Sequence, residues 1–138
     1  MDTTGSSGVQ VVRPGRTYAG KQGFTYGAGA SADTVGAERL CMNVRPMPPG
    51  AKANAHYHRR IETIAYLLEG ECVVRYGDRV QHRAVVRAGD QIFVPADMPH
   101  APCNESGAAC TWLVVHSAGS DQEGIVLLPE LDAIMAAG

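Results

Sequence analysis

The segment GAKANAHYHRRIETIAYLLEG, residues 50–70, decides the interpretation of the chain, because it places His56, His58 and Glu62 close together. Alternate residues of a β-strand point to one face and lie roughly 6.5 Å apart at a rise of ~3.3 Å per residue. His56 and His58 can therefore reach one ion from a single strand. A carboxylate four residues after His58, beyond a tight turn, adds a hard oxygen ligand. The segment predicts part of a metal site.

A third histidine, His100, follows far downstream, after Gly89-Asp90 and Val94-Pro95. Arriving from another strand, it would complete a set of three nitrogens and one oxygen. The simpler alternative is that His56 and His58 are exposed strand residues beside two arginines, one of which pairs with the glutamate. The combination of both segments favours the metal interpretation.

Composition allows one modest domain. With 138 residues and 45% hydrophobic content, the chain can bury a core without disulfides. The formal charge of -2 and the scattered basic residues offer no surface for a polyanion, so we expect no nucleic-acid partner. There is no apolar run of the ~18 residues that would span a membrane and no signal-peptide core at the amino terminus. We therefore predict a cytoplasmic protein with no membrane partner.

Short apolar runs rich in Val, Ile and Tyr lie between frequent glycines and prolines, which is typical of an all-β domain. Eight or nine short strands of this kind suggest a sandwich or barrel. Eight predicted strands are Arg39–Pro46, Ala53–His58, Thr63–Leu68, Glu71–Tyr76, Gln81–Val86, Gln91–Val94, His100–Asn104 and Cys110–His116, and the ninth is Val9–Arg13. In the tail, Ile125–Leu128 is predicted as a last strand.

Three local signals complete the predicted fold. Gly77-Asp78 indicates a hairpin turn in which the glycine takes a positive φ. Pro129 indicates the first turn of a terminal helix over Glu130–Ala137. Residues 1–8 are polar and rich in glycine and serine, so we expect a disordered tail followed by one domain over 9–138. Four cysteines without CxxC spacing are expected to be buried, and a Cys103–Cys110 disulfide is not expected.

At this point the two segments resemble the paired motifs of the cupin superfamily. Gly50, His56-Tyr57-His58, Glu62 and Gly70 are similar to the first cupin motif, at residues 50–70. Gly89, Pro95, His100 and Asn104 are similar to the second, at residues 89–104. The resemblance, closest to small single-domain bacterial cupins, implies a double-stranded β-helix (jelly-roll) barrel and a metal held by His56, His58, Glu62 and His100.

Two positions depart from the motifs. Seven residues instead of six separate Glu62 from Gly70, and a strict count would place Thr63 in the ligand position. Threonine is a poor neutral ligand, and some cupins have the longer spacing, so Glu62 remains the predicted ligand. The second motif normally has glycine where Asp97 stands, which predicts either a left-handed conformation that aspartate tolerates or another turn type.

Three imidazoles and one carboxylate leave an octahedral ion two open positions for water, dioxygen or a bidentate substrate. We prefer Fe(II) or Mn(II), one per subunit, with Zn, Ni and Cu as alternatives. The predicted activity is that of a dioxygenase for a small enolisable or diketone-like compound, with Glu62 also acting as a catalytic base. A metal-dependent isomerase or lyase and a non-catalytic, small-molecule sensor are the alternatives.

Residues at period-two positions are candidates for the wall of a substrate pocket, although any β core would need them as well. The predicted substrate contacts are Met42, Tyr66, Phe93, Trp112 and His116, and the side chain of Arg45 is expected to point outward because Val44 points inward. His82 is expected on the surface. The family resemblance and the open sheet edges further predict a homodimer in which the strand near Val9 pairs with a second subunit.

Overall fold

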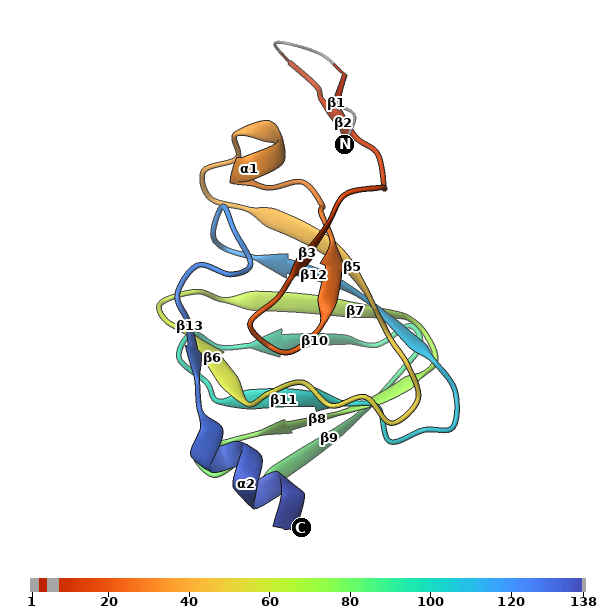
Figure 1. Ribbon diagram of the computed structural model, residues 1–138, viewed down its shortest axis with the longest axis vertical. Coiled ribbons are helices and arrows are strands. Elements are labelled where there is room, and N and C mark those ends of the chain that lie inside the picture. Colours follow the sequence, from red (N-terminus) through yellow and green to blue (C-terminus); the bar gives the residue numbers. More distant parts are fainter. Residues whose placement is uncertain (1–2, 5–7, 138) are drawn as a thin grey trace.

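Two antiparallel sheets face each other in the computed structural model, which describes residues 3–4 and 8–137 (Figure 1). The first sheet has four strands in the order β10-β7-β12-β5. Their bounds are Cys41–Met47 for β5, Thr63–Glu69 for β7, Gln91–Val94 for β10 and Cys110–His116 for β12. This sheet is called the four-stranded sheet below.

The second sheet has five strands in the order β13-β6-β11-β8-β9. Their bounds are His56–His58 for β6, Glu71–Tyr76 for β8, His82–Arg87 for β9, His100–Cys103 for β11 and Ile125–Leu127 for β13. This sheet is called the five-stranded sheet. Together the two sheets form the predicted jelly-roll barrel, and the predicted strands agree with the observed ones to within a few residues at each end.

The amino-terminal part contains elements that were not among the predicted ones. Strands β3 (Thr17–Ala19) and β4 (Thr25–Gly27) form a hairpin, and β4 lies beside β5 (Figure 1). A short helix, α1 (Ala32–Val35), follows. The predicted strand at Val9–Arg13 is shorter, as β2 (Val11–Val12), and it pairs with β1 (Thr3–Thr4) of the same chain. Of the predicted disordered tail, residues 1–2 and 5–7 lie outside the described residues.

Helix α2 (Pro129–Ala137) covers the outer face of the five-stranded sheet. Leu131 and Met135 pack there against Ala55, Ala101 and Cys103. The backbone N–H of Ala55 donates a 2.6 Å hydrogen bond to the Asp132 carboxylate, which fixes the helix against the strand. Burial of these apolar groups explains why a helix of only two to three turns is stable here.

Both predicted turn features are confirmed. Gly77, between β8 and β9, has a φ of 112°, and Asp97 has a φ of 66° in the left-handed region. The Asp97 carboxylate accepts a 2.9 Å hydrogen bond from the Arg60 backbone N–H, and the Asp97 N–H donates to the His58 carbonyl at 3.0 Å. This turn therefore ties the end of β6 to the loop before β11, the two strands that carry the histidines.

For β5, β7 and β10, the prediction of which side chains face the barrel interior is wrong. Met42, Val44, Tyr66 and Phe93 were expected to point inward, yet they are 37% to 55% exposed on the outer face of the four-stranded sheet. Their neighbours in sequence point into the barrel instead. Strands β7 and β10 carry apolar side chains on both faces, so alternation cannot assign the inner one. In β5 the inner face carries the polar Asn43 and Arg45, so the apolar Met42 and Val44 indicated the wrong face.

The four cysteines are free and buried. No helix among the described residues is long and apolar enough to cross a membrane.

Candidate metal centre and cavity

Three histidines from two neighbouring strands of the five-stranded sheet meet at the cavity wall. His56 and His58 lie on β6, and His100 lies on β11, where its backbone is the registered partner of His56. All three are buried, and one potential ligand nitrogen from each lies within 4.8 Å of the others. Period-two alternation along β6 and antiparallel pairing with β11 are what bring the three rings together.

Backbone carbonyls orient two of these rings. His56 Nδ1 donates to the Asn54 carbonyl at 2.7 Å, and His100 Nδ1 donates to the Met98 carbonyl at 2.9 Å. In both rings Nε2 then carries the free lone pair, as metal ligands require. His58 Nδ1 is buried without a hydrogen-bond partner.

Burial keeps these imidazoles neutral. It lowers the pKa of His56 well below 6.5, and it lowers the pKa of His58 to about 2, with the nearby His116 adding to the shift. The pKa of His100 is also lowered, again mainly by burial. A neutral imidazole can coordinate a metal through the lone pair of its unprotonated nitrogen, so the donor set fits a divalent transition metal.

The structure does not bring Glu62 to this group. Its side chain is exposed, while its backbone N–H is held by Ser117 Oγ at 2.9 Å. Thr63, the next residue, is 5% exposed and points into the barrel. A shift of one residue along a strand reverses the face, so the longer spacing before Gly70 places the carboxylate outside. The predicted position of Glu62 in the ligand set is therefore corrected.

His116, predicted as a substrate contact, lies next to the three histidines. Its ring is 4.6 Å from that of His58, centroid to centroid. Both of its nitrogens are occupied: Nε2 lies 3.4 Å from Arg45 Nη2, and Nδ1 lies 2.7 Å from Thr63 Oγ1. Because Arg45 can only donate, His116 Nε2 is the acceptor and Nδ1–H donates to Thr63. These contacts explain why His116 stands beside the group of three without joining it.

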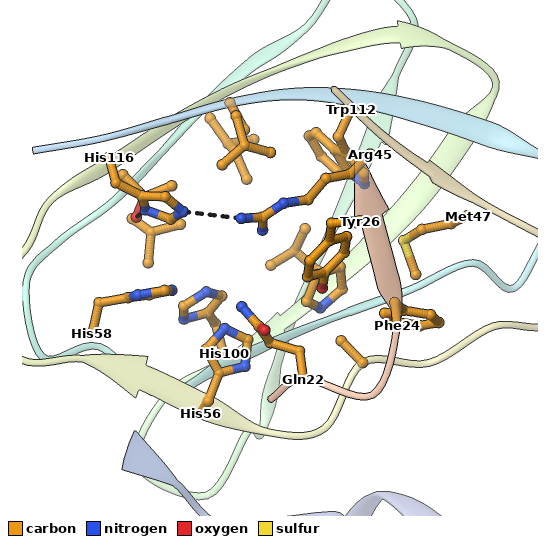
Figure 2. Close-up of a pocket in the computed structure, with 18 residues that line it drawn as sticks. Gln22, Phe24, Tyr26, Arg45, Met47, His56, His58, His100, Trp112 and His116 are labelled. Carbon is orange, nitrogen blue, oxygen red and sulfur yellow. Dashed lines mark hydrogen bonds between the residues drawn. The ribbon is translucent and has the colours of Figure 1, made fainter. Parts of the chain in front are cut away.

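The cavity extends from the histidines into the barrel and has a volume of about 60 Å³, room for a few water-sized groups (Figure 2). Trp112 and His116 line it as predicted. Met42, Tyr66 and Phe93 do not, because they lie on the outer face of the four-stranded sheet. Most of the other lining residues are apolar, among them Phe24, Met47, Ala65, Val74, Ile92, Val94 and Val114.

Arg45 corrects a second prediction, because its side chain enters the cavity and is only 12% exposed. Arg45 Nη2 forms a 2.8 Å ion pair with Asp121, and the guanidinium lies 4.4 Å from the centre of the Tyr26 ring. The buried Asp121 carboxylate also accepts from Tyr18 Oη at 2.7 Å. The partners of Arg45 thus come from the β3–β4 hairpin and from the loop after β12.

Sequence reasoning missed Gln22, Tyr26 and Arg45 as cavity residues. Gln22 and Tyr26 belong to the β3–β4 hairpin, which closes one end of the barrel. The pair Gly20 and Gly23 between two tyrosines is the sequence signal of that hairpin. For Arg45 the local pattern misleads, because the polar Asn43 and Arg45 of β5 face the barrel interior and the apolar Met42 and Val44 face outward.

The fold and the histidines define a double-stranded β-helix with a candidate metal centre inside the barrel. The cupin domain family matches residues 44–116, more than half of the chain. The chain therefore belongs to the cupin family.

Solved structures agree with this assignment. The protein TT1209 from Thermus thermophilus is 34% identical, with a TM-score of 0.54 over 59% of this chain and 75% of that one. A sugar phosphate isomerase from Silicibacter pomeroyi is 26% identical, with a TM-score of 0.56 over 70% of this chain and 71% of that one. An oxalate oxidase bound to the substrate analogue glycolate is 23% identical, with a TM-score of 0.64 over 74% of this chain and 54% of that one, and shares the fold. None of the curated proteins compared with the chain matches it.

Proposed function

We propose that the protein is a mononuclear metal-dependent enzyme that oxidises a small, enolisable or diketone-like compound with dioxygen. The observation that carries the proposal is the cluster of His56, His58 and His100, buried and with ligand nitrogens within 4.8 Å, at the wall of an apolar cavity. Three protein ligands leave more than one position on an ion for substrate and dioxygen. The preferred metal is Fe(II) or Mn(II).

The residues around the ion would position the substrate and exclude water. Apolar side chains fill most of the cavity wall, which strengthens polar interactions inside it. A bound metal would supply Lewis acidity and a site for dioxygen. His116 holds its proton at Nδ1, on the side of Thr63, and presents Nε2 toward Arg45. Glu62 is not assigned the role of base, since its exposed side chain lies outside the cavity.

Oxygen consumption tests the proposal. Protein loaded anaerobically with Fe(II) or Mn(II) is mixed with small diketones and oxo acids, and oxygen uptake is followed with an electrode. We expect uptake with at least one compound and none with the His58→Ala variant. Absence of uptake across the panel, in protein that holds stoichiometric metal, would refute the proposed dioxygenase function.

A metal-dependent isomerase is the second candidate, favoured by the likeness to the sugar phosphate isomerase from Silicibacter pomeroyi. Such an enzyme would convert its substrate without oxygen. Anaerobic turnover of an aldose or ketose phosphate, followed by NMR, distinguishes it from the oxygen-dependent reaction.

We also propose that the protein acts as a homodimer. Six side chains form what we call the apolar outer face of the four-stranded sheet: Met42, Val44, Ile64, Tyr66, Leu68 and Phe93, each 37% to 55% exposed. Together they present on the order of 500 Å² of apolar surface, near the upper end of what monomers expose. A second copy placed on this face would bury it, and with its polar rim the contact would approach the ~800 Å² per partner of a standard interface.

A further inference from the structure

The cavity contains buried donors that the protein itself does not satisfy. Among the described residues, Gln22 Nε2 and Arg45 Nε are buried side-chain nitrogens without a hydrogen-bond partner, and both residues line the cavity. Two further buried nitrogens of the described residues lack a partner: Trp112 Nε1, which faces the Cys72 thiol, and His58 Nδ1 in the histidine group. A buried donor left unpaired costs about 1–3 kcal/mol, so a site with two of them is a site built for an acceptor.

The orientation of the Gln22 amide follows from its neighbours. Gln122 Oε1 accepts from the Lys21 backbone N–H at 2.8 Å, so Gln122 Nε2 is a donor. That nitrogen donates to Gln22 Oε1 at 3.1 Å and to Asp121 at 2.9 Å. Gln22 Nε2 is therefore the free end of the amide. Gln22 is only 1% exposed, and Figure 2 shows its amide group in the space between His100 and Tyr26.

The Arg45 guanidinium is also fixed by its neighbours and keeps free donors. Its hydrogen bonds to Asp121 and His116 both run through Nη2, which leaves the other nitrogens of the guanidinium without a partner among the described residues. The ion pair with Asp121 and the Tyr26 ring fix the group, so it is preorganised for a planar acceptor. Figure 2 shows Arg45 crossing the cavity toward His116, next to the three histidines.

Charge balance points to the same kind of ligand. Asp121 neutralises Arg45, and His56, His58 and His100 would hold a divalent ion with neutral nitrogens only. The full double positive charge of the ion would then lie in a cavity lined mostly by apolar groups. Burying an uncompensated charge is costly, so an anion should accompany the metal.

We propose that the substrate of this cavity is a small carboxylate, with the carboxylate oxygens bound by Gln22 Nε2 and the free N–H groups of Arg45 beside the three histidines. The cavity volume of about 60 Å³ favours a small compound. This inference rests on the proposed function for the presence of the metal, whereas the hydrogen-bond donors are side chains of the protein and are independent of it.

Ligand binding tests the proposal without turnover. Zinc-loaded protein is titrated with 2-oxobutanoate and with 2,3-pentanedione, in which a methyl group replaces the carboxylate oxygen. Trp112, the single tryptophan, lines the cavity and reports binding by its fluorescence, with calorimetry as a second measurement. We expect the oxo acid to bind at least about tenfold more tightly, since hydrogen bonds to a charged group are worth that factor or more.

Variants assign the effect to the two donors. Gln22→Leu should weaken oxo-acid binding about tenfold and leave the diketone unchanged. Arg45→Met combined with Asp121→Asn, which leaves no unpaired buried charge, should abolish the preference. The exposed Arg83→Met is the matched control and should bind like the wild type. Equal binding of the two compounds, no binding of either, or full binding in the Gln22 variant would overturn the proposal.

The same titration on metal-free protein separates this proposal from the proposed function. If the chain retains no metal but still prefers the oxo acid, the metal enzyme fails and the carboxylate site stands. If metal is bound and oxygen is consumed with neutral diketones while the oxo acid shows no preference, the carboxylate site fails and the enzyme stands.

Discussion

The two sheets of the barrel are both antiparallel, but they differ in the residues that face the cavity and in whether the outer face is covered. The five-stranded sheet contributes the three histidines to the cavity, and its outer face is covered by helix α2 of the same chain. The four-stranded sheet contributes Arg45, Thr63, Trp112 and His116, and its outer face exposes large apolar side chains. One sheet is therefore completed within the chain, whereas the other would gain stability from a second molecule.

The inner faces of the two sheets also have different proposed roles. The side of the histidines suits a cation, and the side of Arg45 offers hydrogen-bond donors. A substrate that binds both would lie across the cavity from one sheet to the other. If the two sheets differ in this way, substitutions on one sheet should affect properties that substitutions on the other leave unchanged.

Removal of one histidine from the five-stranded sheet should abolish metal binding. In His58→Ala two of the three nitrogens remain, so we expect metal affinity to fall at least about 100-fold while far-ultraviolet circular dichroism still reports a β fold. Elemental analysis after dialysis measures the metal. The exposed His82→Ala serves as control and should retain it. Stoichiometric metal in the His58 variant would contradict the proposed centre.

A charge on the apolar outer face of the four-stranded sheet should separate the dimer. Ile64 is 52% exposed there, and in Ile64→Lys the interface would bury an unpaired ammonium, so we expect dimer affinity to fall about 100-fold or more. Sedimentation at micromolar concentration measures the mass.

Val85 provides the matched control for this experiment. It is 39% exposed on β9 of the five-stranded sheet, and Val85→Lys should leave the dimer intact. A wild-type protein that sediments as a monomer at tens of micromolar would refute the proposed dimer, and dissociation by both variants would place the contact elsewhere.

Shortening a buried side chain between helix α2 and the five-stranded sheet should destabilise the single chain. Leu131 is 4% exposed between α2 and the five-stranded sheet, so Leu131→Ala should lower the free energy of unfolding by about 2–4 kcal/mol. Urea denaturation measures it. The control is Leu127→Ala, at a residue 43% exposed on β13, for which we expect a much smaller loss. Similar losses at both positions would show that α2 does not protect this face.

Acid should destabilise the metal-free protein through its buried histidines. Burial lowers the pKa of His58 to about 2 and that of His116 to about 3, whereas both protonate near 6.5 in the unfolded chain. Below pH 6.5 the unfolded state thus binds more protons, and the free energy of unfolding falls as pH decreases toward 3.

Each such histidine adds up to about 1.4 kcal/mol per pH unit to the slope. Urea midpoints measured between pH 7 and pH 5 give this slope. His116→Gln should reduce it, and His82→Gln, at an exposed position, should not. An unchanged midpoint over this range would mean that the histidines are not buried as neutral groups.

Much of this molecule is predictable from its sequence, and the exceptions have one physical cause. The motifs around His56, His58 and His100 predicted the barrel and the histidine cluster, because glycine turns and alternate positions fix where those rings point. The inner face of β7 and β10 was not predictable, since both of their faces carry apolar side chains, and in β5 the polar Asn43 and Arg45 lie on the inner face against the usual rule. Arg45 and Gln22 depend on contacts with the hairpin and with Asp121, which are distant in sequence.

Glu62 provides the smallest expected effect and the most direct test of the corrected ligand set. It stands at the position where the motif resemblance implied a ligand, but its side chain is exposed and the inward position belongs to Thr63. Glu62→Gln should therefore leave metal content and metal affinity unchanged within error, because a group outside the cavity contributes no bond to the ion. Elemental analysis and competition with a chelator measure both quantities. Thr63→Val is the informative partner variant: it keeps the inward side chain but removes the acceptor for His116 Nδ1–H. Freed from Thr63, the His116 ring can rotate, so metal affinity should change modestly there and not at Glu62. A loss of metal in Glu62→Gln would instead mean that the turn before β7 rearranges when the ion binds, and that the Glu62 carboxylate completes the centre.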